Sequence, residues 1–341
     1  MAPRHPDRPH PETVPAGAAP AGEDPTGEDL AAYLRAQATE FLRALRTQRE
    51  HGGGTEGAGR ALRRSARRIS AALHTFRTLL DPAWADTLRP ELAWVSGLLA
   101  LEHAQEARLD RLLLALHRLS GPAPAPVRAV VHAGAPAPVP ERSGLTVGAA
   151  KAGALLERRL TLARTRAHSA ALEALGSARF HAVADRVALL ASDVPLAPGA
   201  STAGLGPSAA AAEDRLAGAV SVLPLVTAGD PYNAQALIHG LSPDPAPHPQ
   251  DGPWHQVRLL LRLHRYAREI PHTAPADPRL RPAAEALTRH RDAAEAAAEA
   301  AQAARTPRIA PATAYALGVL HADQRHEVEA ARFTFQQTWQ S

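Results

Sequence analysis

Apolar residues recur at helical spacing along most of this 341-residue chain, and no segment shows a convincing strand-like alternation of polar and apolar residues. The first half predicts helices at about residues 29–50, 59–80, 90–120 and 146–190, the last one broken near Gly176. Asp29 is expected to cap the first of these helices, and Pro90 to lie in the first turn of the third. The second half predicts helices at about residues 208–240, 253–270, 279–303 and 308–339.

This pattern predicts an all-α protein made of two similar four-helix bundles. Residues 1–27 are rich in proline, glycine and charge, and they predict a disordered tail. We expect the N-terminal helical bundle over residues 28–194, a linker over 195–207 and the C-terminal bundle over 208–341. Aromatic residues make up only 4% of the chain and hydrophobic residues 45%, so alanine, leucine and valine must fill the cores.

The stretch WHQVRLLLRLHRYARE, residues 254–269, carries one histidine and three arginines at three- and four-residue intervals. On a helix these four side chains fall within a sector of about 80°, with leucines mainly on the other side. A solvated face is the simpler interpretation, but such a face usually mixes signs because Glu–Arg pairs support a helix. The only acid here is Glu269, at the end, so the stripe indicates one half of an interaction with an anion. The stripe consists of His255, Arg258, Arg262 and Arg265.

The first half repeats this spacing with arginines on its own second helix. Ser70 stands at the fourth position, where the second half has Arg265. The repeat predicts a duplicated unit whose two basic stripes face one shared groove, and chance similarity in an arginine-rich chain is the alternative. The first stripe consists of Arg60, Arg63 and Arg67, with Arg64, Arg68 and His74 adding charge around it.

Composition narrows the chemistry of the protein. The net charge is +4, and Lys151 is the single lysine, so nearly every base is an arginine that can grip phosphate oxygens in a fork. The chain has no cysteine, which excludes disulfides and thiolate chemistry and fits a reducing compartment. The N-terminal residues lack the apolar core of a secretory signal, and no apolar run is long enough to span a membrane. We therefore expect a cytoplasmic protein with no membrane partner.

Patterns of catalysis are absent from the sequence: it contains no GxxxxGK[ST] loop, no GxSxG elbow and no HExxH pair. Carboxylates that could hold Mg²⁺, namely Glu102, Glu106, Glu269 and Asp292, are scattered without a recognisable arrangement. We therefore expect no catalytic residue and no cofactor.

A histidine pair near the C-terminus is also a poor metal site. His321 and His326 are five residues apart, whereas zinc ligands on a helix prefer a spacing of four. No metal is therefore expected. His321 and Arg325, which are four residues apart, more readily extend the basic surface.

The second stripe resembles the signature of the conserved-histidine α-helical domain (CHAD) family. That signature is a histidine, an arginine three residues on, a base four further on, and then an Arg-Tyr pair and a glutamate. The matching residues are His255, Arg258, Arg262, Arg265, Tyr266 and Glu269, with Arg262 where lysine is more usual.

Other segments extend the resemblance to about residues 29–340. ALTRHRDAAEAA resembles the next family helix, with His290 and Asp292 at its polar positions, and TAYALGVLHADQRHEVEAARFTFQQTW looks like the closing helix. The first copy, RALRRSARRISAALHTF, is more degenerate, because Arg60 stands where histidine is expected and Ser70 replaces an arginine. In the helix that follows it, His103 and an alanine replace the usual Arg-Asp pair.

The resemblance implies two bundles related by a pseudo-twofold axis, whose stripes line a central groove that binds inorganic polyphosphate. Such a polymer carries about one negative charge per phosphate and has no bases to read, so a dense line of donors is enough to bind it. We expect polyphosphate, including polyphosphate granules, to be the partner. The expected ligand residues are Arg60, Arg63, Arg64, Arg67, His74, His255, Arg258, Arg262, Arg265, His290, His321 and Arg325.

Other interpretations stay open. An arginine groove would accept any polyanion, so a nucleic-acid-binding protein is one alternative. A phosphohydrolase with an unrecognised site is another. His255 is either a phosphate ligand or an ordinary histidine near a helix end.

Overall fold

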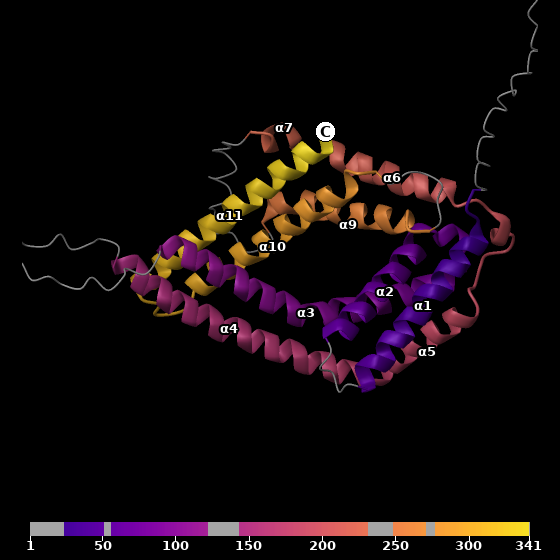
Figure 1. Ribbon diagram of the computed structural model, residues 1–341, viewed down its shortest axis with the longest axis horizontal. Coiled ribbons are helices and arrows are strands. Elements are labelled where there is room, and N and C mark those ends of the chain that lie inside the picture. The colour runs from indigo at the N-terminus through magenta and orange to yellow at the C-terminus, as the bar shows by residue number, and fades with distance from the viewer. Residues whose placement is uncertain (1–23, 51–55, 122–142, 231–247, 271–276, 341) are drawn as a thin grey trace, which may run out of the picture.

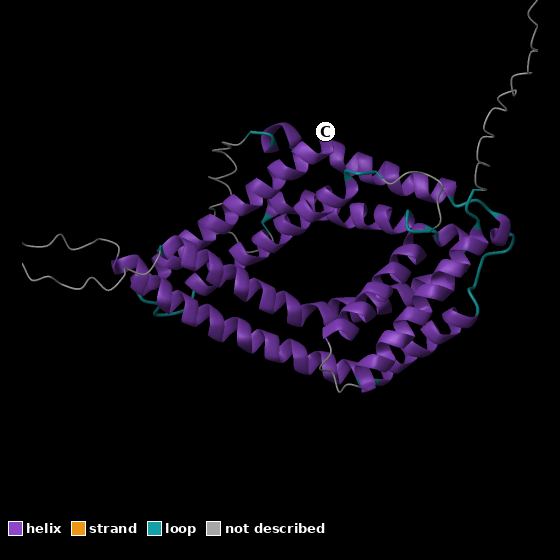
Figure 2. Ribbon diagram, viewed as in Figure 1, coloured by secondary structure: helices purple, strands orange, loops and turns teal. Residues whose placement is uncertain are grey.

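The computed structural model is a set of helices arranged as an elongated ring (Figures 1 and 2). It describes residues 24–50, 56–121, 143–230, 248–270 and 277–340, so nearly all of the tail predicted over 1–27 lies outside the described residues. Within the described ranges no strand forms, and the chain makes only two isolated β-bridges. The all-α fold class is therefore confirmed.

The first helix, α1, begins at Gly27, two residues before the expected cap Asp29. Asp29 lies inside the first turn, where its Oδ2 accepts a hydrogen bond from the N–H of Thr26 at 2.8 Å, as the acidic member of a capping box does. Gly27 is required here, because a Cβ would lie 1.9 Å from the carbonyl oxygen of Ala200. The helices of this half are α1 Gly27–Glu50, α2 Glu56–Thr75, α3 Pro82–Ser120, α4 Ser143–Leu175 and α5 Ala178–Ser192.

The expected start of α3 at Pro90 is wrong. Asp81 caps the helix by accepting the N–H of Trp84 at 2.8 Å, and Pro82 occupies the first turn. Pro90 lies inside the helix, where its ring offers no N–H to the carbonyl of Asp86, yet the helix continues to Ser120. Proline alone therefore did not mark the boundary.

The second half contains three helices whose ends lie within three residues of those expected, α9, α10 and α11. The helix expected over residues 208–240 stops at Ser221, just before Pro224, and most of its remainder lies outside the described residues. The helices of this half are α6 Gly206–Ser221, α7 Leu225–Ala228, α9 Gly252–Ala267, α10 Leu280–Ala304 and α11 Pro311–Gln340.

Three large hydrophobic cores join these helices among the described residues. One surrounds Phe41 and Phe76 and is built mainly from α1, α2, α5 and the first part of α3. A second surrounds Trp254 and Phe335 in α6, α9, α10 and α11. The third core joins the end of α3 and the start of α4 to the end of α10 and the start of α11. The two chain halves therefore share a core, at the end of the ring where α3, α4, α10 and α11 meet (Figure 1).

No helix in the described ranges combines the length and the apolar composition that crossing a bilayer requires.

Candidate functional site: a basic groove between the two halves

Arginines from both halves of the chain line one cavity of about 530 Å³ between α2, α3, α9 and α10. Arg63 and Arg67 come from α2, Arg262 from α9 and Arg291 from α10. Much of the wall on α3 consists of small residues such as Ala93, which leave room between the helices. The structure therefore brings members of the two predicted stripes to the same place.

A second cavity of about 980 Å³ adjoins the first, and Arg63 and Arg291 line both. The second cavity adds Arg108, Arg111 and Arg118 from α3. We call the two cavities together the basic groove, with a narrow part of 530 Å³ and a wide part of 980 Å³.

Four arginines form what we call the unpaired cluster: Arg63, Arg67 and Arg262, which line the narrow part, and Arg258, which lies one turn before Arg262 on α9 and is repelled by Arg262 and Arg291. None of them forms an ion pair within the described part of the chain, and the Nε atoms of Arg63, Arg67 and Arg258 are buried without a hydrogen-bond partner there. Four guanidinium groups thus lie in a partly desolvated space without a paired carboxylate among the described residues. This arrangement favours an anion other than the carboxylates of the described residues.

The pKa values of these arginines reflect the same crowding. Burial lowers the pKa of Arg63 to about 10, with repulsion from Arg67, Arg291 and Arg262 acting in the same direction. Burial, followed by Arg291 and Arg262, lowers the pKa of Arg258 to about 10 as well. Both groups remain protonated at neutral pH, so the repulsion persists until an anion binds.

The single acid of the second stripe is used outside the unpaired cluster. Arg68 donates to both carboxylate oxygens of Glu269, and the hydroxyl of Tyr33 donates to the same carboxylate at 3.2 Å. The guanidinium of Arg68 also lies 5.5 Å from the ring centre of Tyr266. This contact ties α1 and α2 to the end of α9 and removes Glu269 as a partner for the other arginines.

His74 lines the narrow part and lies against an arginine that sequence analysis missed. Its Nδ1 is 2.9 Å from Nη1 of Arg89. Burial and then the charges of Arg89 and Arg215 lower the pKa of His74, so it accepts the hydrogen bond as a neutral ring.

Besides Arg258, four more predicted ligands do not line either cavity. Arg60, Arg64 and Arg265 are exposed, and His255 is half-buried beside the groove with its Nε2 buried and without a hydrogen-bond partner among the described residues. Their binding roles stay predictions.

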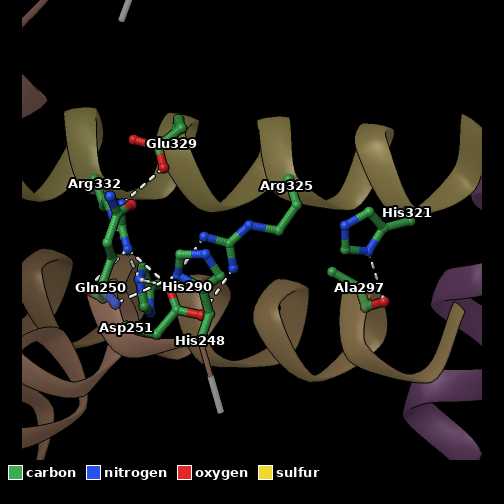
Figure 3. Close-up of polar contacts among 9 residues, drawn as sticks. All are labelled: His248, Gln250, Asp251, His290, Ala297, His321, Arg325, Glu329 and Arg332. Atoms are coloured by element: carbon green, nitrogen blue, oxygen red, sulfur yellow. Dashed lines mark hydrogen bonds and ion pairs between the residues drawn. The ribbon is translucent and has the colours of Figure 1, made fainter. Parts of the chain in front are cut away.

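Two further predicted ligands belong to a buried network instead (Figure 3). Asp251, in the turn before α9, accepts from Nη1 of Arg325 at 2.8 Å and from Nη2 of Arg332 at 2.7 Å. Arg332 Nε donates to Nε2 of His290 at 3.2 Å. Burial lowers the pKa of His290 to about 3, so the ring is neutral and can accept this bond. The network fixes α9 against α10 and α11, and its members line neither cavity.

His321 has a comparable role in packing. Its Nδ1 lies 3.0 Å from the carbonyl oxygen of Ala297, so it joins α11 to α10 (Figure 3). The structure therefore gives no support to ligand roles for His290, His321 and Arg325.

Several groove residues escaped the sequence analysis. Arg291 lies between His290 and Asp292, and one step along a helix turns a side chain by about 100°, from the buried face to the groove. On α3, the signal that could have been found is the recurrence of Arg108, Arg111 and Arg118 at near-helical spacing.

The described side chains contain no cluster of three or more His, Asp or Glu residues that could hold a metal ion.

Comparison with known proteins places this geometry in context. The family model for the CHAD domain matches residues 32–272. The solved structure of PptA from Streptomyces chartreusis is 68% identical, with 93% of this chain and 100% of that chain covered and a TM-score of 0.79. The CHAD domain from the plant Ricinus communis is 18% identical, with 95% of this chain and 97% of that chain covered and a TM-score of 0.48. No curated protein matches the chain.

Proposed function

The chain belongs to the CHAD family, and on this basis we propose that its basic groove binds inorganic polyphosphate. The observation that carries the proposal is the unpaired cluster, in which four arginines from both halves gather without a carboxylate partner among the described residues. Guanidinium forks suit phosphate oxygens, and the release of counterions on binding supplies affinity.

The lining of the groove favours a polyanion without bases. Proteins that bind single-stranded nucleic acid generally stack bases on aromatic side chains. Among the described residues that line the two cavities there is no Phe, Tyr or Trp. A phosphate chain needs no such platform, so polyphosphate suits this lining better than RNA does.

The proposal includes binding without catalysis, action in the cytoplasm and an association with polyphosphate granules. Asp292 and Glu295, which line the wide part, are bonded to arginines of the groove itself. Incubation of polyphosphate with the protein and Mg²⁺ should therefore release no phosphate. Mg²⁺-dependent release above the blank would favour a phosphohydrolase instead.

A titration with polyphosphate of defined length at several salt concentrations tests the binding proposal. Four arginines that release counterions predict a slope of log affinity against log salt of about −3. Single-stranded RNA of equal charge should compete weakly. A salt-independent affinity, or equal competition by RNA, would contradict the proposal.

A further inference from the structure

The two parts of the basic groove differ in what their arginines contact. In the wide part, Nη2 of Arg108 lies 2.6 Å from Oε2 of Glu295. Arg291, which lines both parts, is bonded to Asp292 and lies 3.7 Å from Oε1 of Glu295. Asp292 and Glu295 of α10 thus pair with Arg291 and Arg108, which we call the junction pairs. The arginines of the unpaired cluster form no such pair with a described carboxylate.

These two carboxylates also act on the unpaired cluster itself. The pKa of Arg258 is lowered by burial, Arg291 and Arg262, and the charges of Glu295 and Asp292 oppose that decrease. They are therefore a source of negative charge for the cluster, although they do not form an ion pair with Arg258.

The ion pairs at the junction can be exchanged. The Glu295 side chain is 41% exposed and that of Asp292 38%, so water screens both and each pair contributes little to stability. A phosphate chain that offers several oxygens per turn of helix can replace them at small cost.

We propose that Glu295, with Asp292 beside it, is an internal counter-anion that a bound polyanion must displace, and that it determines which chain lengths the groove retains. This inference rests on the proposed function. A short polyphosphate fits in the narrow part and meets mainly the unpaired cluster, with Arg291 as the arginine there that is already bonded to a carboxylate. A longer chain extends into the wide part, where it must take Arg291 and Arg108 from their carboxylates.

The same displacement predicts a preference for polymers of high charge density. A polymer with closely spaced charges can replace both carboxylates with its own oxygens. A polymer with widely spaced charges replaces fewer contacts and still faces the repulsion of the displaced carboxylates. Glu295 is therefore a specificity-determining residue that weakens the binding of every chain that reaches the wide part, and it weakens the binding of sparsely charged chains most.

Glu295→Gln tests the inference, because it keeps the shape of the side chain and removes its charge. Glu299→Gln is the matched control: Glu299 lies one turn further along α10, pairs with Arg159 at 3.0 Å and lines neither cavity. Affinities are measured for tripolyphosphate and for a long polyphosphate chain.

Glu295→Gln should bind the long chain about three- to tenfold more tightly than the parent, which is the scale of one half-exposed ion pair. Its salt slope should steepen by about one, because a freed arginine releases one more counterion. The gain for tripolyphosphate should be smaller. Glu299→Gln should match the parent with both ligands.

Unchanged affinity of Glu295→Gln for the long chain, or an equal gain in Glu299→Gln, would overturn the inference and leave the proposed function intact. A parent protein that binds neither polyphosphate would instead reject the proposed function. Asp292→Asn provides a second variant, and it should change affinity in the same direction by a smaller factor.

Discussion

Two arginine clusters of this protein differ in one respect that decides their roles. In the buried network, Arg325 and Arg332 are 4% and 5% exposed and share the carboxylate of Asp251. In the unpaired cluster, Arg258 and Arg262 are half-buried and have no carboxylate partner among the described residues. The first cluster has its counter-charge within the protein, and on our proposal the second receives its counter-charge from an external anion.

Burial of an arginine is therefore a poor guide to function when taken alone. Both clusters remove guanidinium groups from water, and in both the removal is costly. The buried network recovers that cost through hydrogen bonds within the fold, so it stabilises one arrangement of α9, α10 and α11. On our proposal the unpaired cluster recovers it when polyphosphate binds.

The sharpest way to break this comparison is to remove the shared carboxylate. Asp251→Asn leaves two buried guanidinium groups without a counter-charge, so the free energy of unfolding should fall by about 3–5 kcal/mol. Urea denaturation followed by circular dichroism measures the change. Asp86→Asn is the control, since Asp86 pairs with Arg77 on the surface and its loss should leave the midpoint unchanged. Equal midpoints for both variants would show that the network is not structural.

Removal of arginines from the unpaired cluster should have the opposite signature. Arg258→Ala with Arg262→Ala should lower polyphosphate affinity by about two to four orders of magnitude, because each charged hydrogen-bonding group contributes about 1.5–3 kcal/mol. The free energy of unfolding should stay constant or rise, since repulsion is relieved. Isothermal titration and urea denaturation measure the two quantities.

A matched comparison asks whether the two halves contribute equally. The pair Arg63→Ala and Arg67→Ala should cost less affinity, because the first stripe has Ser70 in place of a fourth base. Arg43→Ala with Arg46→Ala removes the same charge from exposed positions of α1 and should leave affinity nearly unchanged. Equal losses from both groove pairs would show that the first stripe is compensated, for which Arg89 is the nearest candidate.

Acid should weaken the buried network through His290. Its pKa is about 3 in the folded protein and about 6.5 when unfolded, so the unfolded state takes up a proton first as the pH falls. The stabilisation is complete above about pH 6.5 and is lost toward pH 3, with about 2 kcal/mol gone by pH 5. His290→Gln should flatten this part of the stability curve, and denaturation at pH 7 and pH 5 measures it. Parallel curves for parent and variant would exclude His290 as the cause.

Helical periodicity was enough to predict the fold class and most helix ends, because the buried faces of α9 and α10 follow a regular apolar spacing. It also found Arg63, Arg67 and Arg262, which face the groove from a repeated pattern. Periodicity could not find the buried network. The pairing of Asp251 with Arg325, 74 residues away, depends on how α9 meets α11.

The same limit explains why the histidines were difficult to assign. His290 and Arg291 are adjacent, and only the packing of α10 against α11 decides which of them is buried. The family pattern marked His290 as a polar position. The structure shows that its polar contact is Arg332 rather than the groove.

His255 gives the smallest expected effect and lies between the two clusters. Burial lowers its pKa, Arg258 and Arg291 act in the same direction, and Asp251 and Glu295 oppose them. The neighbouring ring of His290 lies 5.5 Å away and is neutral. A bound polyanion adds negative charge nearby, so it should raise the pKa of His255 and draw a proton onto the ring.

Affinity should consequently rise a few-fold as the pH falls from about 8 to 6, above an arginine contribution that persists at pH 8. His255→Ala should flatten this rise and keep most of the salt dependence, because the arginines supply the counterion release. Titrations of parent and variant at pH 8, 7 and 6 and at two salt concentrations measure both effects. If the variant keeps the parent's pH profile, His255 belongs with the buried network and not with the groove, and the boundary between the two clusters lies at Arg258.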